Sequence, residues 1–290
     1  MPGALTGPDF IGVGPEKTGT SWIDRQLRAH PDVKLPPVKE LRYFWEKSQY
    51  PGETFLQRLA FKESWHRMQY REYGINCLKR LIRHPVQSLF KGRERLIWDY
   101  RYLMLPHDDQ WYLTALDRKD KRLSGEISPQ YFFRPENEIK AIHELLPACK
   151  VIISLRKPID WIWSFAKMNT RSGFLQSEFG SLDNYIDTKM KKFSFSKSLG
   201  YWQQYFPADQ LLVLFYDQLK EDPWGYYQKI CTFLGLEPDE ARRAIVGNKV
   251  NVGSKESLPE EYIEKIRTGW REDIKALSAM VPGVPSSWLE

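Results

Sequence analysis

Three short stretches of the chain are almost entirely hydrophobic, with Asp9 and Ser154 as their polar residues. The stretches are DFIGVG (9–14), VIISL (151–155) and LLVLF (211–215). A nearly continuous apolar run of this length suits a strand that is buried on both faces, as in a parallel sheet covered by helices. The sequence therefore predicts buried strands of one parallel sheet.

Between and after these runs, apolar residues recur at helical spacing. One such stretch, residues 21–30, carries Trp22, Ile23 and Leu27 and ends before Pro31. Other helices are predicted over residues 54–73, 159–168, 224–234 (closed by Gly235) and 260–280. The alternation predicts an α/β fold with a central, mostly parallel sheet flanked by helices.

The organisation of the 290 residues indicates one unit. The chain has no internal repeat, no low-complexity segment and no linker rich in glycine and serine, so we predict a single domain over residues 1–290. Residues 50–110 and 169–198 carry few strand signals and mix helix formers with aromatic residues. We predict that both segments are helical insertions beside the sheet.

Charge and composition exclude some classes of function. The chain has 43 Lys and Arg against 37 Asp and Glu, which gives a formal net charge of +6. The basic runs are short and scattered, and no helix-turn-helix, RNP or zinc-finger signature accompanies them. We therefore expect no nucleic-acid partner.

The cysteines and the chain start bear on location. Cys77, Cys149 and Cys231 form no CxxC pair, and no histidine pair has metal-ligand spacing, so we expect no metal and a reducing compartment. The segment MPGALTGPDF lacks the basic and apolar regions of a secretory signal. No run of about 18 apolar residues is present to span a bilayer. These features predict a cytoplasmic protein without a membrane span.

The first predicted strand leads into a glycine-rich loop, GPEKTGTS (14–21). A P-loop reads G-x-x-x-x-G-K-[ST]; here Gly14, Gly19 and Ser21 keep that spacing, but Thr20 replaces the lysine and Lys17 lies three positions earlier. Glycines that let backbone N–H groups converge, followed by a helix N-terminus, favour an anion. The alternative is an ordinary glycine turn in which Thr20 or Ser21 caps the helix.

A nucleotide kinase would also need an acidic residue for magnesium after a hydrophobic strand. The run VIISL is followed by Arg156, a cation, whereas LLVLFY is followed by Asp217. Asp217 keeps a P-loop small-molecule kinase open as the alternative function.

Two motifs resemble those of the sulfotransferases that use 3'-phosphoadenosine 5'-phosphosulfate (PAPS). KTGTSW (17–22) resembles the loop of that family, and LRKPIDWIWSF matches its second motif, R-x-P-x-x-x-x-x-S, at Arg156, Pro158 and Ser164. Further similar segments are HPDV (30–33), KELRYF (39–44), WYLTAL (111–116) and GEISPQYF (125–132). The resemblance covers about residues 10–236 and is greatest to the heparan-sulfate and bacterial carbohydrate branch.

The resemblance implies a P-loop-like sulfotransferase fold, PAPS as co-substrate and adenosine 3',5'-bisphosphate (PAP) as product, without a metal. It implies Glu40 as the catalytic base and Lys17 as the cation at the leaving group. It also implies a set of nucleotide-binding residues: Lys17, Thr18, Gly19, Thr20, Ser21, Trp22, Arg156, Ser164, Ser254 and Lys255. The last two lie in NVGSK (251–255), which is also plain turn sequence.

The sequence departs from the branch at Ile127, where many members carry a lysine. The acceptor is left open as a hydroxyl or amine of a small molecule or glycan, and the oligomeric state is left open. Burial beside Leu41, Tyr43 and Phe44 is expected to raise the pKa of Glu40. The alternative is that Glu40 only pairs with Lys39 or Arg42 on the surface. A non-catalytic module that binds phosphoadenosine or a glycan is a further alternative.

Overall fold

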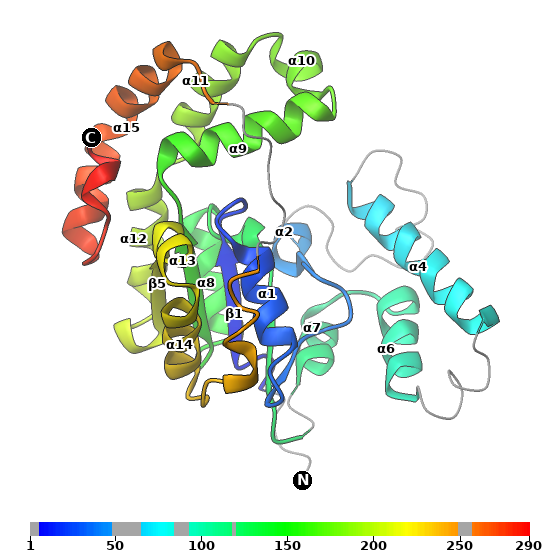
Figure 1. Cartoon of the computed structure of the whole chain (residues 1–290). Coiled ribbons are helices and arrows are strands. Elements are labelled where there is room, and N and C mark those ends of the chain that lie inside the picture. The colour runs from blue at the N-terminus through cyan, green and yellow to red at the C-terminus, as the bar shows by residue number, and fades with distance from the viewer. Residues whose placement is uncertain (1–5, 48–64, 84–92, 118–119, 249–256) are drawn as a thin grey trace.

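The computed structural model describes residues 6–47, 65–83, 93–117, 120–248 and 257–290. Its centre is a five-stranded sheet with the order β2-β3-β1-β4-β5, and every neighbouring pair is parallel (Figure 1). The strands are β1 (Phe10–Gly14), β2 (Val33–Lys34), β3 (Leu123–Ile127), β4 (Lys150–Leu155) and β5 (Leu211–Phe215). The α/β prediction is confirmed, and the three apolar runs form β1, β4 and β5.

The hydrophobic core lies on both faces of this sheet. Along β4, Val151, Ile153 and Leu155 belong to one buried cluster, whereas Ile152 belongs to the other. Helices α8 (Glu136–Leu145), α9 (Pro158–Arg171), α12 (Phe195–Tyr205) and α15 (Glu260–Met280) contribute to the first cluster. Helices α1 (Thr20–Arg28), α13 (Tyr216–Glu221) and α14 (Pro223–Leu234) contribute to the second. Successive side chains of a strand point to opposite faces of the sheet. Because both faces are covered here, nearly every position of these strands is apolar, which explains the nearly continuous apolar runs.

Strand β3 was not predicted, because polar residues interrupt it. Ser124 and Glu126 are nevertheless buried. The Glu126 carboxyl accepts hydrogen bonds from Ser128 Oγ at 2.6 Å, Tyr112 Oη at 2.7 Å and Tyr131 Oη at 3.0 Å. Burial raises the pKa of Glu126, and these donors oppose the rise. A polar residue can thus occupy a central strand when each of its oxygens is satisfied.

Most predicted helices are present with small changes at their ends. Residues 260–280 form α15 (Glu260–Met280), and Gly235 ends α14 in a left-handed conformation with φ of 75°. The helix predicted to end at residue 73 continues to Arg83, and its first part lies outside the described residues. The α-helices of the described residues are α1 (Thr20–Arg28), α2 (Tyr43–Lys47), α4 (Trp65–Arg83), α6 (Arg93–Met104), α7 (Asp109–Leu116), α8 (Glu136–Leu145), α9 (Pro158–Arg171), α10 (Phe174–Phe179), α11 (Leu182–Lys192), α12 (Phe195–Tyr205), α13 (Tyr216–Glu221), α14 (Pro223–Leu234) and α15.

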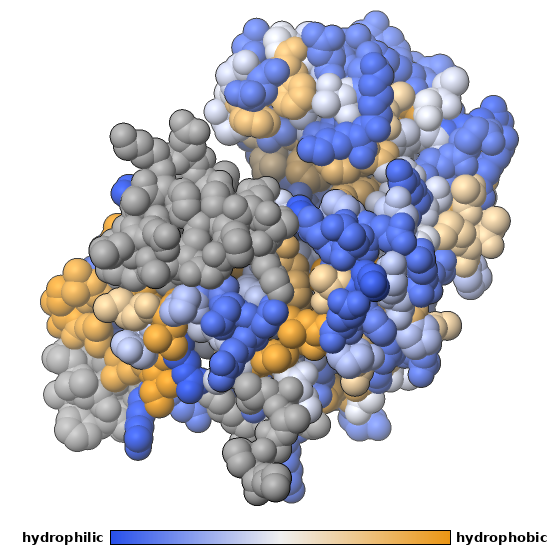
Figure 2. All heavy atoms as spheres, turned by 180° about the vertical axis from the view of Figure 1, so that it is seen from behind, coloured by the Kyte–Doolittle hydropathy of each residue, from blue (hydrophilic) through white to orange (hydrophobic). Residues whose placement is uncertain are grey.

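The described parts of the two expected insertions are helical. Helices α4 and α6 lie on the side of the molecule away from α15, and α9, α10 and α11 lie together beyond one edge of the sheet (Figure 1). Exposed apolar side chains gather on α4 and α6, on the left of Figure 2: Ile75, Leu78, Ile82, Ile97, Tyr100 and Met104. Within the described residues, no helix has both the length and the apolar character to cross a bilayer.

Candidate active site

A large cleft opens at the carboxyl ends of β1 and β4. In the strand order, β2 and β3 lie on one side of β1, and β4 and β5 lie on its other side. The direction in which successive strands are added therefore reverses next to β1, and a ligand cleft is typical of such a switch point. Its volume is about 2420 Å³, well above the roughly 300–1,000 Å³ of a typical small-ligand pocket. There is therefore room for a nucleotide and a second molecule.

The glycine-rich loop forms one wall of the cleft, and side chains hold its backbone. The four successive carbonyl groups from Pro15 to Thr18 all accept hydrogen bonds. The donors, in order, are Thr18 Oγ1 at 2.6 Å, Trp161 Nε1 at 2.8 Å, Arg156 Nη1 at 3.2 Å and Ser154 Oγ at 2.6 Å. In a trans peptide the carbonyl and the next N–H point to opposite sides, so these bonds also fix the direction of the loop N–H groups.

The start of α1 adds further donors. Thr20 and Ser21 are the first residues of this helix, where N–H groups have no acceptor within the helix. The preceding Gly19 has a φ of 94°, and a Cβ there would lie 3.0 Å from side-chain atoms of both Tyr216 and Leu219. The loop with its helix start therefore has the form of an anion-binding site.

Backbone strain gathers at the same cleft. Among the described residues, three non-glycine residues have positive φ: Lys17 at 67°, Glu40 at 59° and Arg42 at 58°. All three line the cleft. Each left-handed residue of this kind costs on the order of 1 kcal/mol or more, and such strain is typical of functional sites.

Lys17 carries its charge into this cleft at an electrostatic cost. Burial lowers the pKa of Lys17, Glu16 opposes the fall, and the positive charges of Arg156 and Arg171 add to it. The described lining holds eight cationic side chains (Lys17, Arg42, Arg134, Arg156, Lys167, Arg171, Lys192 and Lys220) and three carboxylates (Glu16, Glu40 and Asp160). The surplus of positive charge suits a polyanionic ligand.

Arg156 joins the second motif to the loop. Its Nη1 donates to the Lys17 carbonyl, its guanidinium lies 4.8 Å from the ring centre of Tyr216, and Asp160 lies 3.7 Å from its Nη2. The Nε atom of Arg156 is buried and has no hydrogen-bond partner among the described residues. Ser164 lies two turns into α9 and also lines the cleft. The structure thus brings the two predicted phosphate motifs to one wall.

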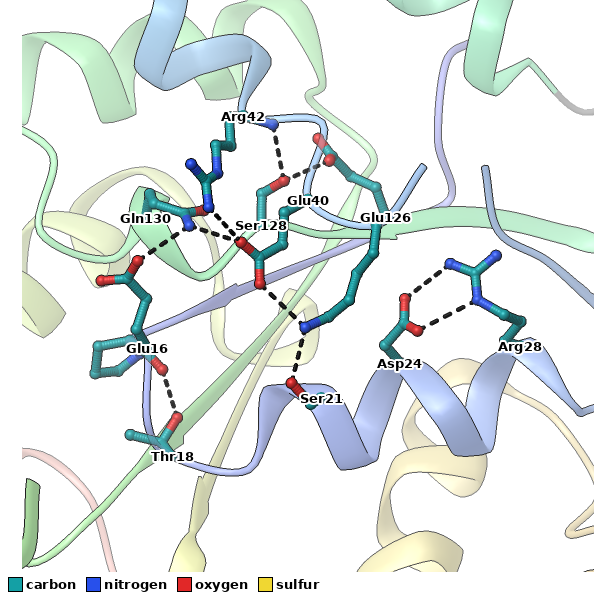
Figure 3. A network of polar contacts seen from close by, with 12 residues as sticks. Glu16, Thr18, Ser21, Asp24, Arg28, Glu40, Arg42, Glu126, Ser128 and Gln130 are labelled. Atoms are coloured by element: carbon teal, nitrogen blue, oxygen red, sulfur yellow. Dashed lines mark hydrogen bonds and ion pairs between the residues drawn. The ribbon is translucent and has the colours of Figure 1, made fainter. Parts of the chain in front are cut away.

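Glu40 is held by three donors. Its Oε1 accepts from Lys39 Nζ at 3.0 Å, and its Oε2 accepts from Arg42 Nη2 at 2.8 Å and from Gln130 Nε2 at 2.9 Å (Figure 3). Burial favours the neutral acid, but Lys39 and Arg42 outweigh burial and hold the pKa of Glu40 below its ordinary value. The expectation of a raised pKa was wrong, because these cations on the same short segment face the carboxylate.

Two of the predicted binding residues have structural tasks as well. Thr18 is fully buried, its hydroxyl is bonded within the loop, and it does not belong to the described lining of the cleft, so its observed task is to hold the loop. Trp22 donates from Nε1 to the carbonyl of Val246 at 2.8 Å and packs edge-on against Tyr226, although it also borders the cleft. Ser254 and Lys255 lie outside the described residues.

Sequence reasoning missed Glu16, Gln130 and the contact between Lys39 and Ser21. Lys39 Nζ donates to Ser21 Oγ at 2.8 Å, which links the loop to the segment of Glu40. Gln130 Nε2 donates to Glu16 Oε1 at 3.0 Å as well as to Glu40. Glu16 precedes Lys17 directly, and Gln130 lies in the segment GEISPQYF, but neither position carries a local signal of a role.

The residues on which the alternative functions and the alternative bases would depend lie outside the described lining of the cleft. Asp217, the acid that a kinase would need, accepts a hydrogen bond from Trp288 Nε1 at 3.2 Å and does not line the described cleft. The described histidines His30, His107 and His143 also lie outside its lining. In the described part of the chain, no group of three or more His, Cys, Asp or Glu side chains is placed to hold a metal ion.

Comparisons with known proteins agree on one family. The model of the sulfotransferase family matches residues 8–240. Heparan sulfate glucosamine 3-O-sulfotransferase 6 of Homo sapiens is 26% identical over 136 residues, covering 44% of this chain and 40% of the relative. Sulfotransferase 2A6 of Rattus norvegicus is 33% identical over 138 residues, covering 46% of each chain. The matched region thus spans less than half of either relative.

A solved structure shares the fold over nearly the whole chain. The crystal structure of a sulfotransferase from Alicyclobacillus acidocaldarius has a TM-score of 0.63 and 20% sequence identity. The likeness covers 98% of this chain and 99% of that chain. Together with the family model, which spans the loop, β1, β4 and β5, it leads to one conclusion: this chain belongs to the sulfotransferase family.

Proposed function

We propose that this protein transfers a sulfonate group from PAPS to a hydroxyl or amine of an acceptor. One observation carries the proposal: Arg156 Nη1 donates to the carbonyl of Lys17, 139 residues away in sequence, at 3.2 Å. The two motifs that resemble the 5'- and 3'-phosphate sites of PAPS-dependent enzymes therefore meet at one wall of a cationic cleft. That arrangement suits a nucleotide with phosphate groups on both sides of its ribose.

The proposed roles are those that the resemblance of the two motifs implies, and the geometry of the wall supports them. The N–H groups of Lys17, Gly19, Thr20 and Ser21 and the hydroxyls of Thr20 and Ser21 hold the 5'-phosphosulfate, with Trp22 packed beside them. Thr18 supports this loop from within through its hydrogen bond to the Pro15 carbonyl. The planar guanidinium of Arg156, with Ser164, holds the 3'-phosphate. Ser254 and Lys255 remain part of this proposal as a covering loop. PAP is then the nucleotide product, and no metal is required by these roles.

Glu40 and Lys17 are proposed to act on the reacting atoms. As the acceptor oxygen or nitrogen forms its bond to sulfur, Glu40 takes the acceptor proton and the bond from sulfur to the 5'-phosphate oxygen breaks. Lys17 stabilises the negative charge that develops on that departing oxygen. Lys39 and Arg42 keep Glu40 ionised, so the base is in its reactive form at neutral pH.

The acceptor is proposed to be a carbohydrate. Half-buried aromatic side chains, Trp45, Phe133 and Trp163, line the cleft beyond the loop, together with exposed Phe174. Apolar faces combined with a few polar groups are typical of sites for such ligands. The similarity to a heparan sulfate 3-O-sulfotransferase adds support, although it covers less than half of that relative.

We also propose that residues 1–290 act as one sulfotransferase domain in the cytoplasm. Helix α15 packs against α9, α11 and α12, so the last part of the chain shares the core of the first. The three cysteines, Cys77, Cys149 and Cys231, are free and buried, which suits a reducing compartment.

The function is tested by following radiolabelled sulfonate from PAPS to a panel of oligosaccharides, glycolipids, small alcohols and amines. We expect magnesium-independent transfer, tight binding of PAP and weak binding of ATP. Glu40→Gln should lower single-turnover transfer by about 100- to 10,000-fold while the affinity for PAPS changes by less than about threefold. Magnesium-dependent binding of ATP as strong as that of PAP would favour a kinase, and PAP binding without transfer would favour a non-catalytic module.

A further inference from the structure

A single side-chain amide connects two carboxylates inside the cleft. Gln130 Nε2 donates one hydrogen bond to Glu16 Oε1 at 3.0 Å and another to Glu40 Oε2 at 2.9 Å (Figure 3). An amide NH2 group has two donors, so both are used here. Because the two oxygens are bonded to the same nitrogen, they lie within about 6 Å of each other, a range in which like charges interact strongly.

Each end of this bridge is anchored separately. The carbonyl of Glu16 accepts a hydrogen bond from Trp161 Nε1 at 2.8 Å, and Trp161 is buried in the core. At the other end, Lys39 and Arg42 hold Glu40. Glu16 therefore cannot move away from Gln130 by a shift of the loop alone, and the bridge is a fixed part of the cleft wall.

The two carboxylates face different surroundings. Burial raises the pKa of Glu16, and the negative charge of Glu40 raises it further, whereas Arg42, Gln130 and Lys189 oppose the rise. The pKa of Glu40 is lowered, as described above. The charged groups that act on the pair come from the loop, from residues 39–42 and from α11: Lys17, Lys39, Arg42 and Lys189. As pH rises, Glu40 therefore ionises first and Glu16 ionises later.

We propose that Glu16 is a positioning residue for sulfonate transfer: it helps to orient Glu40 through the shared amide of Gln130, and its charge acts on Glu40 directly through space. This inference rests on the proposed role of Glu40 as the base. Gln130 fixes Oε2 of Glu40, so the carboxylate keeps one orientation toward the acceptor. When Glu16 ionises, its negative charge makes Glu40 a stronger base and offsets part of the effect of Lys39 and Arg42.

The order of ionisation gives this role a distinct signature. The single-turnover rate at saturating PAPS should rise once as Glu40 loses its proton and again, at higher pH, as Glu16 loses its proton. Ionisation of a carboxylate at this range raises the pKa of its neighbour by about one unit, which corresponds to a rate increase of about 3- to 10-fold. The 3'-phosphate of PAPS also titrates near pH 6, so the step must be assigned with variants.

Three variants separate charge from orientation. Glu16→Gln removes the charge with little change of shape, and we expect it to lose the upper step and to stay about 3- to 10-fold below the wild-type rate at every pH above that step. Glu16→Asp restores the charge and should restore the step. Gln130→Met keeps both carboxylates but removes the bridge, and it should lower the rate at every pH while the step remains. PAPS affinity and the melting temperature are measured for each variant.

Glu136→Gln is the matched control. Glu136 accepts a hydrogen bond from the amide of Gln204 at 3.0 Å, as Glu16 does from Gln130, but it lies on α8 outside the cleft lining. Its replacement makes the same change of charge and should leave the pH profile unaltered. An upper step of wild-type size in Glu16→Gln, or a wild-type profile with no upper step, would overturn the inference.

The proposed function can fail separately. If Glu40→Gln turns over at a near-normal rate, Glu40 is not the base and both proposals about the base are wrong. If Glu40→Gln is inactive and Glu16→Gln keeps the full upper step, Glu40 retains its role and only the role of Glu16 is removed.

Discussion

Replacement of Arg156 by alanine tests whether the two phosphate sites are distinct. In the structure Arg156 has two features that bear on this: its Nη1 donates to the Lys17 carbonyl at 3.2 Å, and the residue lines the cleft. The first gives it the task of supporting the loop that is proposed to hold the 5'-phosphate. The second is consistent with its proposed task of holding the 3'-phosphate. Arg156→Ala removes both, and two ligands can separate them.

The magnitudes differ for the two tasks. A hydrogen bond to a neutral carbonyl contributes about 1 kcal/mol, and this loss should weaken PAP and adenosine 5'-phosphate equally, by about fivefold. Two charge-assisted bonds to a phosphate contribute about 3 kcal/mol in a side chain that is 20% exposed. PAP should therefore lose about 150-fold more affinity than adenosine 5'-phosphate.

Isothermal titration calorimetry with both nucleotides measures this difference, and a thermal melt of each variant checks that the fold is intact. Arg171→Ala is the matched control, because Arg171 lines the same cleft but belongs to neither motif. It should weaken both nucleotides by less than about 1 kcal/mol, and added salt should remove most of the effect. Equal losses for PAP and adenosine 5'-phosphate in Arg156→Ala would refute the assignment of the 3'-phosphate.

Three further predictions concern Lys17, Lys189 and Gly14. Lys17→Ala should lower single-turnover transfer by about 100- to 1,000-fold and weaken PAPS binding; normal turnover would remove Lys17 from the leaving-group role. Burial lowers the pKa of Lys189 to about 8. At a pH between this value and the ordinary pKa of lysine, the unfolded chain holds a proton that the folded chain has lost, so the free energy of unfolding rises with pH. Urea unfolding from pH 7 to 10 should show this rise in the wild type and a smaller rise in Lys189→Met, because Lys17, whose pKa is also lowered, remains; an unchanged rise would contradict the assignment. Gly14→Ala should destabilise the protein by about 3 kcal/mol or more in thermal unfolding, because φ is 96° and a Cβ would lie 2.4 Å from the Pro129 carbonyl oxygen. Its control is Gly180→Ala, where φ is 69° but the space is open, so a loss of only about 1 kcal/mol is expected; equal losses would refute the clash.

The local pattern predicted the strands whose side chains are apolar on both faces and the helices with a clear apolar stripe. It missed β3, because Glu126 is polar and only its bonds to Tyr112, Ser128 and Tyr131 permit its burial. Those partners come from a helix and from the turn that follows the strand. A rule that reads one segment at a time cannot know that donors from other segments will satisfy a buried carboxylate.

The chemical motifs also divide into features that one sequence segment shows and features that depend on the folded structure. The glycine spacing of the loop, the position of Lys17 and the Arg156-x-Pro158 pattern are local in sequence, and they sufficed to predict an anion-binding loop and to indicate the family. The protonation behaviour of Glu40 was predicted in the wrong direction. Its apolar neighbours were visible in the sequence, but the strength of the two ion pairs depends on distances of 3.0 Å and 2.8 Å that only the folded segment sets.

The sequence by itself determined which segments become buried strands and which loop has the residues to receive an anion, since both depend on side-chain type and backbone freedom within a few neighbouring positions. The tertiary structure alone decided which carboxylates share a site. Gln130 meets Glu16 across 114 residues and Glu40 across 90 residues, because parallel pairing of β1 with β3 brings the ends of both strands to one edge of the sheet. Coulomb interactions depend on distance in space, so the ordering of the two carboxyl pKa values appears only when that edge is assembled.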